Sequence, residues 1–434
     1  ERPLTRFPFA IVTAVASLSM ALLVFLSAIA RPTQAQPLSG VVGTCNEASL
    51  KTALAGGGMV TFGCSGTITL TSSALITSPT TIDGVGQSVT INGNNIVRII
   101  TTTSGVGTLT MQNITLTKGF VNSGAGIDRN GGAVFVRGNL VLSNVTIISN
   151  TSGTGQGGGA YITGTLILVD SQFISNTASL QGGGALVSGT VTLNGGLFQN
   201  NRSRTSFGGG LYMSSTLALT GTHFISNTAS QGGGLYHVGS TGRVVNALFA
   251  RNVATSTLGA GVFLSSTGTV AIFHTTIASP TVGGGSAIHV AAGTIGITNS
   301  IVSSYSIGIN GAAGTLYEDY NLFSGNTTNI SGTVTSGGHS LTGNPAFVFP
   351  ASNNYHLGNG SAAINLGLNA GVLTDIDGDT RDVICGVDAG YDETAGKVSL
   401  CGLSAINNSR TPFGYATAFT ATVTGTLPIT IEWN

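Results

Sequence analysis

The sequence predicts an all-β chain folded as a right-handed parallel β-helix of about 13 coils, each of about 25 residues. Two markers repeat with this period. The leading Gly of each Gly triplet or its variant falls at positions 131, 157, 182, 208, 232, 259 and 284. The large apolar residue of a FISN-like segment falls at positions 147, 173, 198, 224, 249 and 277. A unit of this length holds three short strands and three bends, with no room for a long helix.

Composition agrees with a folded, β-rich chain. The 434 residues are 41% hydrophobic and 7% charged, include 66 glycines and carry no formal net charge. Disordered chains are instead highly charged and poor in β-branched residues. Between positions 138 and 317 there is one acid, Asp170, against four arginines. That density of positive charge is too low to follow a phosphate backbone, so no nucleic-acid partner is expected.

The first 35 residues predict a secretory signal peptide. Arg2 and Arg6 precede an apolar run from Phe7 to Ala30, and small residues follow up to Ala35. The alternative is an N-terminal membrane anchor, because the run is long enough to span a bilayer. Either segment would place the remaining chain outside the cell, secreted or at the cell surface. Contact with the membrane is expected only through this segment or through a C-terminal anchor beyond the sequence given.

Four cysteines fit an exported chain. Cys45 and Cys64 lie close together in the sequence near the start of the mature chain, and Cys385 and Cys401 lie close together near its end. We expect one local disulfide at each end. The alternative of a cysteine metal site lacks the CxxC or CxH spacing that such sites use.

The repeat itself explains why an aromatic residue, an Asn and a Gly triplet recur in one order. Equivalent residues of successive coils lie one strand spacing apart, about 4.8 Å. Recurring Phe residues would therefore stack inside the helix. The recurring Asn residues would form a hydrogen-bonded ladder at a bend. This ladder is expected to comprise Asn150, Asn176, Asn201, Asn227 and Asn252.

The three-residue strand after each Gly triplet predicts an outer stripe. Its first and third positions would face inward and its second position outward, where Ile288 would be the last member. His237 and His289 would share the inward third position. The candidate binding residues on this stripe are Phe135, Tyr161, Tyr212, Tyr236 and Phe263. The stripe would dock a glycan or a partner; alternatively, its rings only stabilise the sheet or lie beneath a loop.

Both ends of the β-helix are expected to be covered. Residues 41 to 58 would form the N-terminal cap, with a helix that begins after Asn46 and stops at Gly56-Gly57. Residues 59 to 393 would form the β-helix and its closing part. Residues 404 to 434 alternate like a hairpin and would be the start of a β-sandwich module, immunoglobulin-like or PKD-like and incomplete.

An acidic stretch near position 380 is the one candidate metal site. Asp375, Asp377 and Asp379 alternate as the ligands of calcium loops do, with Gly378 allowing the turn. No cofactor is expected, and calcium is the one possibility, at this stretch. The alternative is a closing loop rich in Asx turns, in which Arg381 pairs with a carboxylate.

Two groups of motifs resemble known families. GGGLY with FISN resembles the GGA[ILV] and FxxN repeats of the polymorphic outer membrane proteins. CNEASLKTAL…TTIDG and DIDGDTRD…GVDAGYDE resemble exported bacterial right-handed β-helix proteins that end in a domain of the choice-of-anchor Q type. The resemblance covers roughly residues 41 to 393. It implies a secreted or surface-exposed bacterial protein, of a group in which some members are adhesins.

We therefore expect a non-catalytic protein that acts in adhesion or binding, with a polysaccharide or a cell-surface molecule as its ligand. The alternative is a polysaccharide lyase or glycoside hydrolase of the pectate-lyase-like β-helix type. Such enzymes need paired carboxylates, or carboxylates that hold calcium beside a base. Asp170 is the only acid between positions 131 and 300, and one carboxylate makes no pair.

Overall fold

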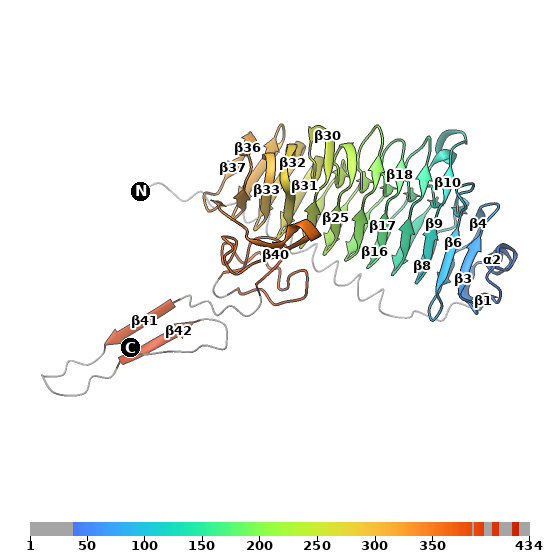
Figure 1. Cartoon of the computed structure of the whole chain (residues 1–434), viewed down its shortest axis with the longest axis horizontal. Coiled ribbons are helices and arrows are strands. Elements are labelled where there is room, and N and C mark those ends of the chain that lie inside the picture. The colour runs from blue at the N-terminus through green and yellow to red at the C-terminus, as the bar shows by residue number, and fades with distance from the viewer. Residues whose placement is uncertain (1–37, 384–385, 395–401, 408–418, 425–434) are drawn as a thin grey trace, which may run out of the picture.

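The computed structural model describes residues 38–383, 386–394, 402–407 and 419–424. It confirms the predicted fold class. Short strands stack in parallel, coil upon coil, into a β-solenoid of about 11 turns (Figure 1). The expected signal peptide and the expected Cys385–Cys401 disulfide lie outside the described residues.

The N-terminal cap consists of strand β1 (Leu38–Val42) and helix α2 (Glu47–Leu54). Asn46 caps the helix, because its side-chain oxygen accepts a hydrogen bond from Ser49 N at 2.9 Å. Leu50 and Leu54 on the helix are buried in the main hydrophobic core. A disulfide joins Cys45, just before the helix, to Cys64, just after strand β2 (Gly58–Phe62).

Each middle coil contributes one strand to each of three parallel faces, here called the first, second and third sheets, and a short fourth strand at a corner. The three faces join into one 32-stranded sheet, and the corner strands form a separate 6-stranded sheet. The first sheet contains β2 (Gly58–Phe62), β5 (Thr80–Asp83), β8 (Thr108–Gln112), β12 (Asn139–Ser143), β16 (Leu166–Val169), β20 (Val191–Asn194), β24 (Leu217–Thr220), β28 (Gly242–Val245), β34 (Thr315–Asp319) and β37 (Thr335–Ser336). The second contains β3 (Gly66–Thr69), β6 (Val89–Asn92), β9 (Thr115–Thr117), β13 (Thr146–Ile148), β17 (Gln172–Ile174), β21 (Leu197–Gln199), β25 (His223–Ile225), β29 (Leu248–Ala250), β35 (Leu322–Ser324) and β38 (Leu341–Thr342).

The third sheet follows the Gly triplets. It contains β4 (Ala74–Ile76), β7 (Ile100–Thr102), β11 (Val134–Val136), β15 (Ala160–Ile162), β19 (Ala185–Val187), β23 (Leu211–Met213), β27 (Leu235–His237) and β36 (Thr328–Gly332). The corner strands are β10 (Phe120–Val121), β14 (Thr151–Ser152), β18 (Thr177–Ala178), β22 (Arg202–Ser203), β26 (Thr228–Gln231) and β30 (Val253–Leu258). Three long strands, β31 (Val262–Phe273), β32 (Thr276–Thr298) and β33 (Ile301–Gly311), each run through more than one sheet.

Inward-facing side chains form one continuous core along the stack. Phe173, Phe198, Phe224 and Phe249 are fully buried, and consecutive rings lie parallel with centroids 4.8 to 4.9 Å apart. This distance is one strand spacing, so the stack is a direct consequence of the coil repeat. At the Gly corner there is no room for a side chain, since a Cβ on Gly183 would lie 2.4 Å from Gly209 O.

The stack has about 11 turns rather than the expected 13, for two reasons. Coil length varies: Thr108 pairs with Asn139, 31 positions further on (139 − 108), and part of the extra length forms the 3-10 helix Gly126–Arg129. Parallel pairing also ends with β38 at Leu341–Thr342 and does not continue to position 383.

Residues 344–383 and 386–394, here called the closing segment, leave the stack and return across its side. They include β39 (Phe347–Phe349), the 3-10 helix Pro350–Ser352 and β40 (Asn354–Leu357), and they lie beside β25 (Figure 1). Tyr355 and Tyr391 cover Ile225, Leu248 and Ala250 on the outside of the second sheet. The closing segment therefore covers the side of the helix.

The part of the chain beyond the closing segment that the structure describes is one antiparallel strand pair, β41 (Gly402–Asn407) with β42 (Phe419–Thr424). Its first strand begins earlier than the hairpin expected from the sequence. Of the helices in the described ranges, none is both long and apolar enough to cross a membrane.

Candidate functional site

The five residues of the predicted outer stripe lie in register on the third sheet. Phe135 pairs with Tyr161, Tyr212 with Tyr236, and Tyr236 with Phe263. The Tyr212 and Tyr236 rings are 5.4 Å apart, and those of Tyr236 and Phe263 are 4.4 Å apart. Phe135, Tyr161 and Leu186 cluster apart from the interior core, so the stripe is on the outside of the helix.

The stripe is nevertheless covered. Phe135 is fully buried beneath the guanidinium groups of Arg98 and Arg137, and Tyr161, Tyr236 and Phe263 are no more than 8% exposed. Phe207 stacks on Tyr236 with ring centroids 4.7 Å apart. Only Tyr212 is half-buried. The structure thus favours the alternative interpretation, in which the rings stabilise the sheet and leave little surface for a ligand.

The last member of this stripe differs from the prediction. His289, and not Ile288, pairs with Phe263 and stacks on it at 4.9 Å. Gly285 rather than Gly284 takes the positive-φ corner of this coil (φ +81°), which moves the register by one residue. His237 and His289 consequently do not share a position, since His237 faces inward and is fully buried.

The predicted Asn ladder runs along the bend after the second sheet. Each side-chain Nδ2 donates to Oδ1 of the Asn in the next coil at 2.9 to 3.0 Å, from Asn150 to Asn252. Backbone N–H groups of Asn150, Asn176, Asn201 and Asn227 donate to the same oxygens. All five side chains are buried. These side chains satisfy the hydrogen-bonding groups of the bend from inside the helix. Because they are buried, they offer no surface to a ligand.

A second corner, after the first sheet, bears a line of polar residues with positive φ. We call it the seam, and in coil order it comprises Asn113, Asn144, Asp170, Asn246, His274 and Asn299, with φ between +45° and +55°. Short polar side chains tolerate this conformation better than others. Asp170, the lone acid of the middle coils, occupies one of these turn positions.

The closing segment docks on the last three seam residues. Arg381 Nη2 donates to Asn246 Oδ1 at 2.9 Å. His274 Nδ1 lies 3.2 Å from Asp388 O. Asn299 Oδ1 accepts from Leu368 N, and its Nδ2 donates to Leu368 O. The closing segment is thus attached to the helix by hydrogen bonds at the seam and by apolar contacts beside it.

His274 makes this docking sensitive to acid. Its Nδ1 donates to the Asp388 carbonyl, and its Nε2 accepts from Asn299 Nδ2 at 2.9 Å, so the neutral ring is fully bonded. Burial first, and the nearby charge of Arg381 second, hold the pKa of His274 well below its usual value of 6.5. Protonation of His274 Nε2 would place its N–H against the Asn299 Nδ2 amide, which is itself a donor.

We expect acidification to weaken docking through His274. Below about pH 6.5 the undocked ring takes up a proton that the docked ring refuses, so stability falls by up to about 1.4 kcal/mol per pH unit. Burial raises the pKa of Glu393 to about 7 and that of Asp392 to about 6, so protonation of these two carboxyls strengthens docking over the same pH range. The contribution of His274 is therefore measured as a difference between two proteins, the original and His274→Asn, which carries the residue type of the neighbouring seam positions. Between pH 7 and pH 5.5, hydrogen exchange of residues 368–391, corrected for its intrinsic pH dependence, should accelerate more, or slow less, in the original protein than in His274→Asn. The same pH dependence in both proteins would contradict the role of His274.

The three aspartates of the predicted calcium loop do not converge on one point. Asp375 Oδ1 accepts the N–H groups of Asp377 and Asp379 at 2.9 and 2.8 Å, and its Oδ2 accepts Glu393 N. This is the Asx-turn alternative, and Arg381 pairs with Glu393 at 3.0 Å. Asp379 is exposed on the surface.

Asp377 instead meets two residues that the sequence analysis did not single out. Its Oδ2 lies 2.8 Å from His356 Nε2, and Asp392 Oδ1 lies 3.9 Å from the same nitrogen. Burial raises the pKa of Asp392 to about 6. His356 is on β40, more than 20 residues before Asp377, and no spacing in the sequence indicates that the three meet.

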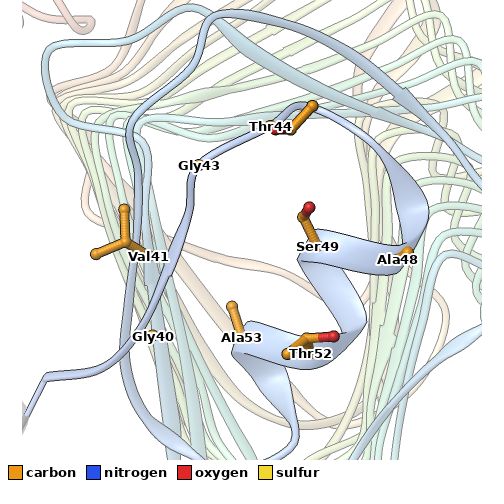
Figure 2. Close-up of a pocket in the computed structure, with 8 residues that line it drawn as sticks. All are labelled: Gly40, Val41, Gly43, Thr44, Ala48, Ser49, Thr52 and Ala53. Atoms are coloured by element: carbon orange, nitrogen blue, oxygen red, sulfur yellow. The ribbon is translucent and has the colours of Figure 1, made fainter.

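The N-terminal cap contains a shallow hollow between β1 and α2. Figure 2 shows the Ser49 and Ala53 side chains directed into it, opposite the chain at Gly40 and Gly43. Its lining is backbone, small apolar side chains and the hydroxyls of Thr44, Ser49 and Thr52. None of its lining residues has an acidic or basic side chain, so it has hydrogen-bonding groups without acid or base chemistry.

Comparison with known proteins does not distinguish between a binding protein and an enzyme. No family model, no curated protein and no solved structure matches the chain.

Proposed function

We propose that the protein is a secreted or cell-surface binding protein whose β-helix presents a flank of uncharged strand residues to a polysaccharide or to the surface of another cell. The single observation that carries this proposal is the outer face of the first and second sheets in the coils before the closing segment. We call it the uncovered flank. Its outward residues are Val141, Ser143, Thr146, Ile148, Ile167, Val169, Gln172, Ile174, Thr192, Asn194, Leu197 and Gln199.

The chemistry of the uncovered flank supports a neutral ligand. All twelve residues are half-buried, and none is charged. One acid, Asp170, is exposed at the corner between β16 and β17, in the middle of the flank. Amide and hydroxyl groups alternate with aliphatic side chains, a combination that can hydrogen-bond sugar hydroxyls and contact the apolar faces of sugar rings. The strands pair in exact register, for example Ile148 with Ile174. Outward-facing positions therefore recur at one strand spacing, as suits an extended ligand.

The neighbouring coils supply a second line of support. In register with Ile148 and Ile174, the outward residues Ile225, Ala250 and Ala278 are buried under the closing segment. The outer face of these coils thus packs against another segment of the same chain, the closing segment. The Cys45–Cys64 disulfide fits an oxidising location outside the cell.

One assay tests both functions, because it measures whether the protein is retained by a polysaccharide and whether it cleaves that polysaccharide. The purified protein is incubated with a panel of neutral and acidic polysaccharides and with whole cells, with and without calcium. We expect retention without cleavage. Cleavage of any polysaccharide would instead favour the β-helix lyase or hydrolase, a function that the same fold accommodates. Absence of retention and cleavage alike would overturn the binding proposal.

Charged substitutions test whether the uncovered flank is the binding face. Gln172→Glu with Thr192→Glu places two charges on the uncovered flank, and we expect retention to fall by about tenfold or more, because these carboxylates must be desolvated against a neutral ligand. Thr163→Glu, at an exposed position after β15, is the matched control and should bind like the original protein. If retention falls equally in the flank variant and in Thr163→Glu, the ligand binds outside the uncovered flank.

A further inference from the structure

Three side chains from separate parts of the closing segment converge beside the helix. They are His356 on β40, Asp377 in the turn made by Asp375, and Asp392 next to the buried Tyr391. One ligand-type atom from each, Nε2 or a carboxylate oxygen, lies within 4.8 Å of the other two. Bound to one ion, they would cross-link the three parts of the closing segment.

The surroundings of His356 orient its ring for such a role. Its Nδ1 lies 2.7 Å from Asn354 Oδ1, an oxygen that can only accept, so Nδ1 carries the proton. In the neutral ring Nε2 then holds the lone pair that a metal ion needs. Nε2 is buried, and no atom of the described residues makes a hydrogen bond to it.

Both carboxylates lie at ion-pair distances from this nitrogen, and neither makes a hydrogen bond to it. Asp377 Oδ2 is 2.8 Å away but lies off the direction in which Nε2 would donate. Asp392 is buried, and its Oδ2 accepts Leu357 N at 2.6 Å, which leaves Oδ1 facing Nε2 at 3.9 Å. A lone pair between two negative oxygens is repulsive unless a cation, either a proton on Nε2 or a metal ion, lies among them.

We propose that His356, Asp377 and Asp392 bind a divalent first-row transition-metal ion such as Zn²⁺. One imidazole nitrogen with two carboxylate oxygens suits Zn²⁺ and its neighbours, whereas Ca²⁺ takes oxygen ligands. Two carboxylates balance the charge of the ion. Asp377 and His356 are partly exposed and provide a path of entry, and water or a further ligand would complete the coordination. The inference is independent of the proposed binding function.

The test is direct metal binding by the full chain. The protein is stripped with a chelator, dialysed and titrated with Co²⁺, whose visible absorption reports coordination, and then with Zn²⁺ as competitor. We expect one ion per chain, displacement of Co²⁺ by Zn²⁺, and affinity for Zn²⁺ lowered about tenfold or more in His356→Gln and in Asp377→Asn. The Asp377 side chain is 54% exposed, so Asp377→Asn should fold normally.

A second His–Asp pair provides the matched control. His339 Nδ1 lies 3.0 Å from Asp319 Oδ2, in a pair outside the three-residue group. His339→Gln should bind Zn²⁺ as the original protein does. The proposal is overturned if the stripped chain binds neither Co²⁺ nor Zn²⁺, if both His356→Gln and Asp377→Asn bind with unchanged affinity, or if His339→Gln abolishes binding.

Discussion

Replacing Asn201 with Ala is expected to destabilise the β-helix by about 4 kcal/mol. Asn201 is fully buried at the centre of the Asn ladder. Its Oδ1 accepts both the backbone N and the side-chain Nδ2 of Asn176, and its Nδ2 donates to Phe173 O and to Asn227 Oδ1. Alanine would leave these buried groups without partners, and each unsatisfied group costs about 1–3 kcal/mol.

Urea unfolding followed by circular dichroism measures this effect, with the free energy of unfolding compared between the original protein and Asn201→Ala. The matched control is Asn200→Ser. Asn200 precedes the ladder residue but is exposed, and Ser175 and Ser226 occupy the equivalent positive-φ position in the adjacent coils. We expect the control to change stability by less than about 0.5 kcal/mol. A loss below about 1 kcal/mol in Asn201→Ala would show that the ladder contributes little.

Features that repeat with the coil could be predicted from the sequence, because each coil places its residues in the environment of the one before. The parallel fold, the Phe173 to Phe249 stack and the line of buried Asn residues all follow from a period of about 25 residues. The capping helix at α2 was predictable for a different reason, since Asn46 and the following apolar spacing are local signals.

Features that depend on departures from the repeat could not be predicted in the same way. The stripe on the third sheet is buried because Phe207, Arg98 and Arg137 cover it, and none of these recurs from coil to coil. The shift at Gly285 moves His289 outward by a single residue, which a count of Gly triplets does not resolve.

The closing segment lies furthest from what the sequence can indicate. Its hydrogen bonds join positions more than 100 residues apart, such as Arg381 with Asn246 and Asp388 with His274. The sequence did indicate an Asx-turn loop with a paired Arg381, because that motif is local. It did not indicate that Asp377 would meet His356, because this contact depends on how β40 packs on the helix.

Arg381→Ala is expected to release the closing segment from the helix, at a cost of about 3–5 kcal/mol. The guanidinium of Arg381 is fully buried. Its Nη1 donates to Glu393 Oε2 at 3.0 Å, and its Nη2 donates to Asn246 Oδ1 and to Gly390 O. Alanine would leave the Glu393 carboxylate buried without its cation, and the loss of a partner from a buried ion pair costs more than the pair itself contributes.

Limited proteolysis and hydrogen exchange of residues 344–394 measure the release, while exchange of the strands β12 to β20 reports whether the rod itself remains folded. A double-mutant cycle with Glu393→Ala isolates the ion pair. Because the double variant buries no unpaired charge, it should be destabilised by clearly less than the sum of the two single variants. Additive losses would mean that Arg381 acts through its bonds to Asn246 Oδ1, Asp388 O and Gly390 O alone. The seam would then hold the closing segment through hydrogen bonds, with the Arg381–Glu393 charge pair contributing nothing of its own.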